Sequence, residues 1–371
     1  MAKPVKSLLR AIRMAIAIIT IVVLAALTMS YLSAYVSPAT VWWFQLFGLA
    51  YPVLAIGSII GIIALYFIHK KWMFAGLIIL LIGSPIHIRY IGGNWWNTSS
   101  STPRKTIAVA SFNVRLFDIY KWLHPQLDKS ERLFCQHIKK LDADILCFQE
   151  YASDDRKTKH MHAKSILTAG GFKNYTEELT VQTKNIDFGL AIYTKGKILQ
   201  NGLINDKNKL YSLFADIALH GDTVRVYNTH LQSIRFQQDE YSLFDGKALS
   251  KKSFFERVGG VLKKLKSAYP ERIKQANALI KHAASSTYPV IICGDFNEPP
   301  SSYIYTTFNR KYKDAFRSEG SGTGRTYAGK IPAGRIDYIF ADKHFDIHSF
   351  DILNDQPLSD HFPIITKLHL K

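Results

Sequence analysis

The stretch Val290–Pro300, VIICGDFNEPP, decides the fold of this chain. A short apolar run bounded by turn residues is typical of a buried strand, and Gly294 and the two prolines mark where this one stops. Asp295 and Asn297 stand at alternate positions at its end, so we expect both side chains to point to one side of the sheet's rim. Asp and Asn also favour turns, so this stretch alone fits a simple strand-to-loop connection equally well.

The 371 residues fall into two parts of different composition. Residues 1–103 contain no Asp or Glu and only seven of the 47 Lys and Arg residues. The rest of the chain carries the other 40 basic residues (47 − 7) and all 29 acidic ones, a formal net charge of +11 (40 − 29). This difference indicates that the two parts lie in different solvents.

Three apolar runs fill the first part: Met14–Val36, Val41–Ile68 and Trp72–Ile88, the last interrupted by Pro85. The first two are long enough to cross a bilayer, which takes about 20 residues. The first is also too long for a plain signal peptide and lacks a small-residue cleavage site. We therefore expect residues 1–90 to be a membrane anchor with about three transmembrane helices, which makes the lipid bilayer a partner of this chain.

The Lys and Arg residues beside the apolar runs predict the orientation of this anchor. Four of them precede the first run, and Lys70 and Lys71 follow the second, whereas the loop 37–40 has none. Because cytoplasmic loops carry an excess of Lys and Arg, the N-terminal tail is expected inside the cell. Three spans would then place the part after the linker 91–104 outside the cytoplasm; without the third span it would be cytoplasmic.

From residue 105 to residue 371 the pattern alternates strands and helices. Residues 131–141 and 272–284 are predicted helices, the second preceded by Pro270. The predicted strands are 106–114, 144–150, 188–195, 223–231, 290–294, 336–340 and one within 358–370. Cys135, Cys147 and Cys293 have neither disulfide nor metal-site spacing and are expected to be free thiols.

The boundaries of these strands share one property, a polar or ionisable residue. Four strands end in one and two begin with one, and the residues are Asn113, Glu150, His230, Asp295 with Asn297, Asp337, and the pair Asp360-His361. A single polar residue at a strand boundary carries no information about function. Six such boundaries indicate side chains that converge at one rim of a sheet sandwich. The last two strands are then expected to run in the opposite direction.

These residue types suit metal-assisted attack of water on a phosphate ester. Glu150 offers a carboxylate and Asn113 an amide oxygen, the hard ligands that Mg²⁺ prefers. Asp295 could act as general base towards a water, and Asn297 could hold that water or a phosphate oxygen. Taken alone, Asn113 is more often a turn residue, whereas a charge such as Glu150 at the end of a buried strand needs a partner.

Two histidines complete the set. His361 and His230 could donate hydrogen bonds to phosphate or protonate a leaving oxygen, although a lone His230 is more often structural. Asp337 could hold His361 in one tautomer. The sequence has no GxSxG nucleophile turn and no HExxH or Cys/His cluster, so covalent acyl chemistry and zinc have no support.

Six segments resemble, in order and spacing, the motifs of the endonuclease/exonuclease/phosphatase superfamily: SFNVR, DILCFQE, YNTHLQS, GDFNEPPSS, RIDYIF and LSDHFP. That superfamily includes deoxyribonuclease I, exonuclease III, sphingomyelinases and inositol polyphosphate 5-phosphatases. The resemblance extends over about residues 105–371. It implies an α/β fold, a four-layer sandwich of two mixed β-sheets flanked by helices, and a Mg²⁺- or Mn²⁺-dependent hydrolase.

The resemblance also implies a role for each residue. Asn113, Glu150 and Asp360 match metal-side residues, Asp295 and Asn297 the water-activating and phosphate-orienting pair, and His361 with Asp337 the phosphate-contacting histidine and its support. His230 in YNTHL stands where the exonuclease III branch has a YxPN-type pattern. At this motif the sequence instead resembles the deoxyribonuclease and sphingomyelinase branches.

Three functions remain open from the sequence. The first is a membrane-anchored phosphodiesterase, most simply a nuclease, because the charge of +11 favours a polyanion. The second is a lipid phosphodiesterase of the sphingomyelinase type or an inositol-phosphate-type phosphatase, since anionic phospholipids and phosphorylated small molecules also attract Lys and Arg. The third is a catalytically silent basic binding module. The basic insertion 235–266 is expected to be a solvated helical flap or a wall that steers an anionic substrate, and no protein partner is predicted.

Overall fold

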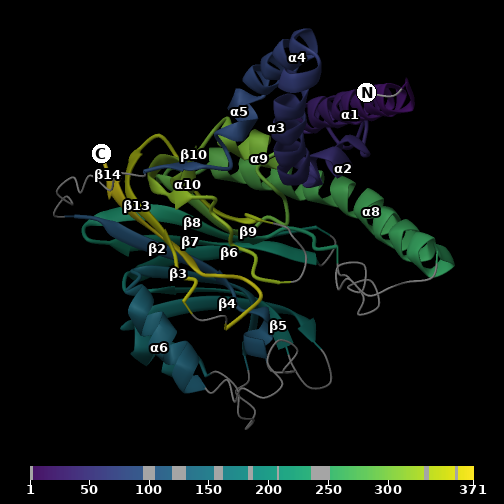
Figure 1. Cartoon of the computed structure of the whole chain (residues 1–371). Coiled ribbons are helices and arrows are strands. Elements are labelled where there is room, and N and C mark those ends of the chain that lie inside the picture. The colour runs from purple at the N-terminus through teal and green to yellow at the C-terminus, as the bar shows by residue number, and fades with distance from the viewer. Residues whose placement is uncertain are drawn as a thin grey trace. The chain divides into compact units, whose positions relative to one another are not determined.

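The structure is a computed structural model that describes residues 3–94, 105–118, 131–153, 162–182, 187–206, 209–234, 251–329, 334–355 and 358–371. The chain divides into two compact units. Unit 1 contains Met1–Tyr90 together with the segment Pro299–Thr307, and unit 2 contains Ile91–Glu298 and Phe308–Lys371. Figure 1 gives the labels of the helices and strands used below.

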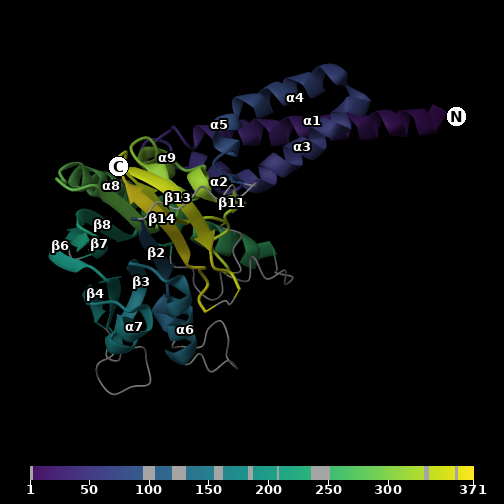
Figure 2. The same cartoon turned by 90° about the vertical axis from the view of Figure 1, so that its left-hand side faces the viewer.

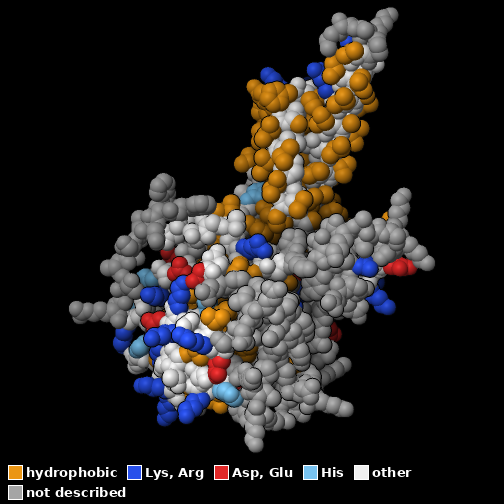
Figure 3. Space-filling model, turned by 60° about the horizontal axis from the view of Figure 1, so that its bottom comes forward, with side chains coloured by type: hydrophobic (Ala, Val, Ile, Leu, Met, Phe, Trp, Pro, Cys, Tyr) orange, Lys and Arg blue, Asp and Glu red, His pale blue; other side chains and the backbone are white. Residues whose placement is uncertain are grey.

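Unit 1 is helical, and its first 90 residues form α1 (Lys3–Leu32), α2 (Phe44–Leu49), α3 (Tyr51–Ile68), α4 (Lys70–Ile82) and α5 (Ser84–His87). α3 packs against both α1 and α4, and the three helices lie side by side (Figure 2). Large apolar side chains cover their outer surface (Figure 3), and Val53, Phe67 and Leu81 are each more than two-thirds exposed. Such a surface is unusual for a soluble helix bundle and marks an interaction site.

The three apolar runs expected to span the membrane form helices of different lengths. Among the described residues two helices, Val5–Leu32 and Tyr51–Ile68, are long and apolar enough to cross a membrane by length and composition. The third run does not form one helix: α4 has 13 residues and measures about 20 Å at 1.5 Å per residue, less than the ~30 Å hydrocarbon core. Gly83 between α4 and α5 keeps right-handed helical dihedrals, so the path continues into α5.

Unit 2 contains two six-stranded sheets, in the orders β10-β12-β9-β8-β7-β6 and β13-β14-β2-β3-β5-β4. The first consists of β6 (Lys197–Asp206), β7 (Lys209–Leu219), β8 (Asp222–His230), β9 (Val290–Asp295), β10 (Lys313–Asp314) and β12 (Asp337–Ala341). The second consists of β2 (Ile107–Asn113), β3 (Ile145–Ser153), β4 (Asn174–Gln182), β5 (Asp187–Thr194), β13 (Phe345–Ile352) and β14 (Ile364–Leu370). The short strands β1 (Gly92–Gly93) and β11 (Ser321–Gly322) pair with each other.

Each large sheet is mixed, as predicted. β8 with β9 and β2 with β3 are parallel pairs, whereas β12 and β14 run antiparallel to β9 and β2. The helices of this unit are α6 (Glu131–Leu141), α7 (Ala163–Gly170), α8 (Lys251–Ala284) and α10 (Ala315–Glu319), with the 3-10 turn η1 (Arg115–Asp118) after β2 and with α9 (Tyr303–Asn309) beginning in the segment that belongs to unit 1. The sheets face each other, with α6 on one side and α8 on the other (Figure 1).

Two of the apolar clusters that hold these layers together show how they pack. One lies between the sheets and includes Val109, Cys147, Val226 and Cys293, all fully buried. The other lies between the second sheet and the pair α6–α7 (Figure 2), with Phe134 and Ile166 among its buried residues. Burying a side chain of this size stabilises a fold by about 1.5–3 kcal/mol, so the alternating apolar residues fix which face of each strand is inside. The three cysteines are free, as expected.

The predicted start of the helix after Pro270 is wrong. α8 begins at Lys251, and Pro270 lies in its interior. One buried face runs through the proline at helical spacing, from Leu265 through Tyr269 and Ala276 to Leu279. Burial of this face outweighs the roughly 3 kcal/mol that an interior proline costs a helix. Residues 251–266 of the expected insertion therefore form the first half of α8, whereas residues 235–250 lie outside the described residues.

Candidate active site

Strand register brings three of the predicted residues together on the first sheet. His230 and Asp295 are partners at the ends of the parallel strands β8 and β9. Asp337 starts β12, which runs the other way, and is the partner of Asp295 on its second side. Gly294 makes this close pairing possible, because its φ is +140° and a Cβ there would lie 1.8 Å from the carbonyl oxygen of Thr229. This steric requirement explains why a glycine directly precedes Asp295 in the sequence.

The second sheet supplies the other residues at the same edge. Asn113 ends β2 and pairs with Gln149 of the parallel strand β3. Glu150 follows in a left-handed conformation, with φ of 48°, where the register between β3 and β5 shifts between Phe148 and Tyr151. A non-glycine residue with positive φ is uncommon outside functional sites and turns. The irregularity turns Glu150 out of the ladder towards the first sheet, with its Oε1 3.8 Å from His230 Nε2.

Asp295 is the centre of the site. Its side chain is buried, and its two oxygens accept hydrogen bonds from Asn113 Nδ2 at 3.1 Å and from the Asn297 backbone N–H at 2.8 Å. Its Oδ2 also lies 3.6 Å from His230 Nε2 and 3.8 Å from His361 Nε2. Burial raises the pKa of Asp295, and the carboxylate of Asp337 adds to this, although the two histidines act in the opposite direction.

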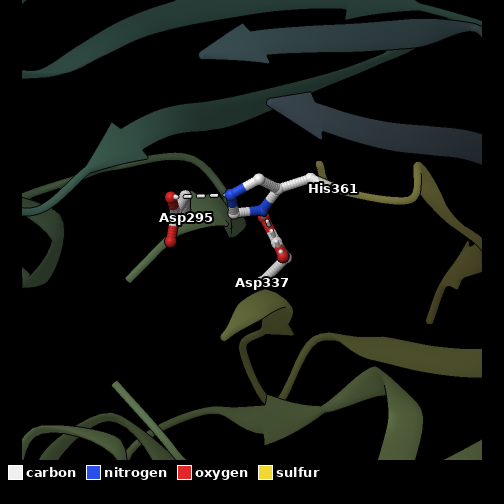
Figure 4. Close-up of side chains that lie close together, drawn as sticks. All are labelled: Asp295, Asp337 and His361. Carbon is white, nitrogen blue, oxygen red and sulfur yellow. Dashed lines mark hydrogen bonds and ion pairs between the residues drawn. The ribbon is translucent and has the colours of Figure 1, made fainter. Parts of the chain in front are cut away.

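His361 and Asp337 form a buried pair beside Asp295 (Figure 4). His361 Nδ1 lies 3.1 and 3.0 Å from the two carboxylate oxygens of Asp337. Burial by itself lowers the pKa of His361, but Asp337 and then Asp295 outweigh it and raise the pKa to about 10. At neutral pH the imidazole is therefore a cation that carries a hydrogen on each ring nitrogen. The ring of Tyr327 packs edge-on against it at 5.1 Å between centroids.

Asn297 is placed differently from the expectation. β9 ends at Asp295, and Asn297 has φ of 53°, so the alternation of a strand does not apply to it. Asn tolerates this left-handed conformation better than most residues. Its Nδ2 donates to the carbonyl oxygen of Leu231 at 3.0 Å, while its backbone N–H holds Asp295. Asn297 thus stands beside Asp295 because of a turn and not because of a shared strand face.

His230 Nε2 is a buried atom that lacks a hydrogen-bond partner among the described residues. It lies between Asp295 and Glu150, at 3.6 and 3.8 Å from their oxygens. A buried polar atom without a partner costs about 1–3 kcal/mol, so such atoms in native proteins usually meet water, an ion or a ligand. The space in front of His230 is therefore suited to a polar ligand.

Two groups of residues could hold a divalent metal. Asp295, Asp337 and His361 have ligand atoms that all lie within 4.8 Å of one another. A cationic His361 that already uses Asp337 repels a second cation, so this trio fits a hydrogen-bonded pair beside a base better than an ion cage. Glu150, with its side chain 31 % exposed, and the Asn113 amide oxygen fit Mg²⁺ better.

The carboxylate of Asp360 already has two partners, Arg115 and Ser359. Its Oδ2 lies 3.3 Å from Arg115 Nη1, and Ser359 Oγ donates to its Oδ1 at 3.3 Å. Arg115 was missed by sequence reasoning, although it stands next to Asn113 in SFNVR. Its φ is 44°, and its backbone N–H donates to Asn113 Oδ1 at 3.1 Å, so it fixes the orientation of the Asn113 amide.

A second missed feature is a polar network beneath the site. Gln149 Nε2 donates to Asn228 Oδ1 at 2.6 Å, and Asn228 Nδ2 donates to the carbonyl oxygens of Phe148 and Ala191 at 2.7 and 2.9 Å. Both side chains are fully buried and join the two sheets. The sequence contained a signal for both, since each is a polar residue inside an apolar strand and lies within two positions of a predicted site residue.

The comparisons with known proteins match this architecture. Residues 110–361 match the Endonuclease/Exonuclease/phosphatase family, and residues 13–90 match a domain of unknown function, DUF8431. A curated relative, the CCR4-Not complex 3'-5'-exoribonuclease subunit Ccr4 of Candida albicans, is 23 % identical over 320 residues, which are 66 % of this chain and 38 % of the relative. The chain thus spans less than half the length of that protein.

Solved structures show the same fold. An endonuclease/exonuclease/phosphatase from Bacteroides vulgatus has a TM-score of 0.53 and 18 % identity, with 72 % of this chain and 100 % of that chain covered. One from Beutenbergia cavernae has a TM-score of 0.52 and 17 % identity, with 72 % of each chain covered.

Proposed function

Because this chain belongs to the endonuclease/exonuclease/phosphatase family, we propose that unit 2 is a divalent-metal-dependent hydrolase of phosphodiester bonds, most simply a nuclease. The observation that carries the proposal is the environment of Asp295. A buried carboxylate is held by Asn113 and Asn297, and it faces two histidines, one of them paired with Asp337. A structural aspartate in a turn needs none of these neighbours.

Asp295 acts as the general base. Its raised pKa brings the carboxylate closer to neutral pH, where a base combines ionisation with useful basicity. Asn113 and the backbone of Asn297 fix its two oxygens, so the carboxylate can take a proton from a water only along the remaining lone pairs. The water then attacks phosphorus, and the bond to the leaving oxygen breaks.

His361 and His230 stabilise the charge that develops on the phosphate. His361 is a buried cation that keeps Nε2 directed to the site while Asp337 holds Nδ1. His230 Nε2 is free to donate to a phosphate oxygen. Hydrogen-bond donors fixed in advance at such positions typically contribute several kcal/mol to transition-state stabilisation.

Glu150 and Asn113 would hold Mg²⁺ or Mn²⁺, with Asp360 as a further carboxylate nearby. Such an ion, when bound, polarises the phosphate and neutralises charge on its oxygens. Because Asp360 already forms an ion pair with Arg115, Glu150 would be the main anionic ligand of the metal ion.

The experiment uses the purified full-length chain in detergent. We expect hydrolysis of bis(p-nitrophenyl) phosphate and of single-stranded RNA or DNA with Mg²⁺ or Mn²⁺, and none in excess EDTA. Full activity in EDTA would overturn the metal-dependent mechanism. Absence of hydrolysis of every phosphodiester with either metal would favour the silent binding module.

A lipid phosphodiesterase of the sphingomyelinase type, or an inositol-phosphate-type phosphatase, is the second candidate. The exposed apolar surface of α1, α3 and α4 favours it, because a membrane anchor keeps an enzyme close to lipid substrates. Vesicles that contain sphingomyelin or phosphoinositides belong in the same substrate panel. If the enzyme hydrolyses these lipids faster than oligonucleotides, the second candidate is the correct one.

We further propose that unit 1 is inserted in the bilayer through α1, α3 and the combined path of α4 and α5. The positive residues in the first part of α1 and directly after α3 then face the cytoplasm, and unit 2 lies outside it. α4 and α5 together run from Lys70 to His87. These 18 residues measure about 27 Å at 1.5 Å per residue, close to the hydrocarbon thickness.

A further inference from the structure

Asp337 and His361 pair with each other although they belong to different sheets of unit 2 (Figure 4). Asp337 begins β12 of the first sheet, where pairing with Asp295 on β9 fixes it. His361 precedes β14 of the second sheet, and Ser359 in the same loop donates to the carbonyl oxygen of Asn113 on β2 at 2.7 Å. The two ladders do not by themselves set the distance between Asp337 and His361. A contact that joins the His361 loop to the start of β12 is therefore of interest.

A three-residue segment, Thr326–Ala328, holds the backbone around His361. The N–H of Phe362 donates to the carbonyl oxygen of Thr326, and the N–H of Ala328 donates to that of Asp360, each at 2.7 Å. These two bonds lie on either side of His361 and form an isolated antiparallel bridge. The segment thus fixes the backbone of His361 as a neighbouring strand would.

Thr326 also holds the start of β12, and it does so through its side chain. Its Oγ1 accepts the N–H of Ile336 at 3.1 Å and the N–H of Asp337 at 3.2 Å. The N–H groups of Thr326 and Tyr327 donate in turn to the carbonyl oxygen of Gly334, at 3.1 and 3.0 Å. Thr326 is completely buried, so water does not replace these bonds.

The hydroxyl oxygen of Thr326 is the atom on which this connection depends. Without it, two buried N–H groups lose their acceptor, and the segment is no longer tied to the start of β12 through a side chain. The backbone of His361 would move with the segment, because the carbonyl oxygen of Thr326 is part of the bridge. His361 Nδ1 lies 3.1 and 3.0 Å from the Asp337 oxygens. Such distances are near the long end of the N–H···O range, so a displacement of about 0.5 Å breaks the hydrogen bond.

We propose that Thr326 is the positioning residue that sets the distance between Asp337 and His361. Its carbonyl oxygen holds the backbone beside His361, and its hydroxyl oxygen holds the backbone of Asp337. The inference rests on the proposed function, because it takes the Asp337–His361 pair as part of the reaction. Thr326 acts through this pair.

The test compares Thr326→Val with Thr326→Ser in the full-length chain in detergent. Valine has nearly the shape of threonine but lacks the hydroxyl oxygen, whereas serine keeps it. Thr194→Val is the matched control, because Thr194 is also completely buried in unit 2 and its Oγ1 accepts the N–H of Gly196 at 2.9 Å. Thr194 pairs with Ile145 on β3. Glu150 lies five residues further along that strand, or about 17 Å at 3.4 Å per residue.

Each variant is measured for kcat and KM with bis(p-nitrophenyl) phosphate and Mg²⁺, for melting temperature, and for hydrogen exchange of the Ile336 and Asp337 amides. We expect Thr326→Val to lower kcat by about 10- to 100-fold with KM changed less than about 2-fold, because a misplacement of about 1 Å costs up to about 10²-fold. Both amides should exchange faster, and Thr326→Ser should recover most of kcat. Thr194→Val should lower the melting temperature by a few degrees, as Thr326→Val does, and leave kcat unchanged.

A double-variant cycle separates positioning from a general structural role. In the Asp337→Asn background, Thr326→Val should lower kcat by less than about 2-fold, because residues that act through one another are not additive. If Thr326→Val does not fold, Thr326→Cys takes its place with the same expectations, since a thiol is a weak acceptor.

Four outcomes would overturn the inference. They are unchanged kcat in Thr326→Val, unchanged exchange of the two amides, an equal loss of kcat in both Asp337 backgrounds, and an equal loss in Thr194→Val. A wild-type chain that hydrolyses no phosphodiester would instead refute the proposed function, and with it the role of Thr326 in the reaction.

Discussion

Replacement of Asp295 by Asn distinguishes a catalytic base from a turn residue. The substitution keeps the size of the side chain and its ability to form the turn but removes the basic carboxylate. A general base typically contributes about 10²–10⁴-fold, so a loss of about 10³-fold in kcat, or about 4 kcal/mol of barrier, is expected. A residue that only shaped the turn would lose almost nothing.

The effect on stability follows from the hydrogen bonds. Asp295 accepts from Asn113 Nδ2 and from the Asn297 N–H. An amide offers one oxygen, so one of these buried donors loses its acceptor, which costs about 1–3 kcal/mol. Relief of the buried charge offsets part of this cost. The melting temperature should therefore fall by only a few degrees, since 1 kcal/mol corresponds to about 2–4 °C at this size.

Asp216→Asn is the matched control. Asp216 is also buried in unit 2, where it pairs with Arg225 at 2.6 Å. Arg225 precedes His230 by five residues on β8, or about 17 Å at 3.4 Å per residue. Breaking this buried pair should cost about 3 kcal/mol or more in stability and leave kcat unchanged. The assay is initial-rate hydrolysis of bis(p-nitrophenyl) phosphate beside thermal unfolding. Near-normal turnover of Asp295→Asn, or an equal loss in Asp216→Asn, would refute the role of base.

Three further predictions concern His361, Glu150 and the anchor. The folded pKa of His361 is raised to about 10 from 6.5, so its stabilising contribution is complete below about pH 6.5 and is lost as pH rises through about 10. Asp337→Asn removes the main cause and should move the alkaline limb of the kcat profile to lower pH; an unmoved limb would contradict the pairing. Glu150→Gln should raise the Mg²⁺ concentration for half-maximal activity at least about 10-fold, since a metal site loses a charge; an unchanged metal titration would exclude Glu150 as a ligand. A reporter fused after Asn94 should be active only outside the cytoplasm, and activity only inside would show that α4 and α5 do not cross.

Most of the central strands and the site's edge were predictable because their signals are local, whereas the interior strand β7 was not predicted. β9 is fully buried and therefore reads as a continuous apolar run that ends at Gly294 and Asp295. The polar residues that end β2 and β8 stand out against apolar runs, and so does Glu150, although β3 continues past the predicted end at Glu150 to Ser153. α6 was predicted with its observed bounds, Glu131–Leu141, because its apolar residues recur at helical spacing.

The outer strands were not predicted, and their position explains why. β4, β6 and β13 each lie at an edge of a sheet, where one side of the strand has no partner among the described strands. Each also contains a shift in register, as between Ile347 and Ser349 of β13. A bulge breaks the two-residue alternation from which a strand is recognised. These residues form strands because they pair with a neighbouring strand. A short stretch of sequence does not show which segment that neighbour is.

The same limit applies to the site. That Asp337 supports His361 could be inferred from residue types, but the role of Arg115 depends on a left-handed turn that aims its backbone N–H at Asn113. Asn297 reaches Asp295 through a turn of the same kind. Because several residue types tolerate positive φ, spacing along the chain does not reveal it.

The contacts of Pro299–Thr307 extend this limit to the whole chain. Ser301 lies 268 residues from Ser33 and 253 from Gly48, its partners in unit 1. In sequence the first part is recognisable only by its apolar runs, and Ser33, Gln45 and Arg89 look like minor interruptions of them. Polar groups inside an apolar helical unit remain buried only if they find partners there. Gln45 donates to the carbonyl oxygen of Ser33, and Ser33 in turn donates to Ser301. Their presence thus indicates that these helices bind a polar segment of their own chain, which is a requirement that a lipid-facing anchor alone would not impose.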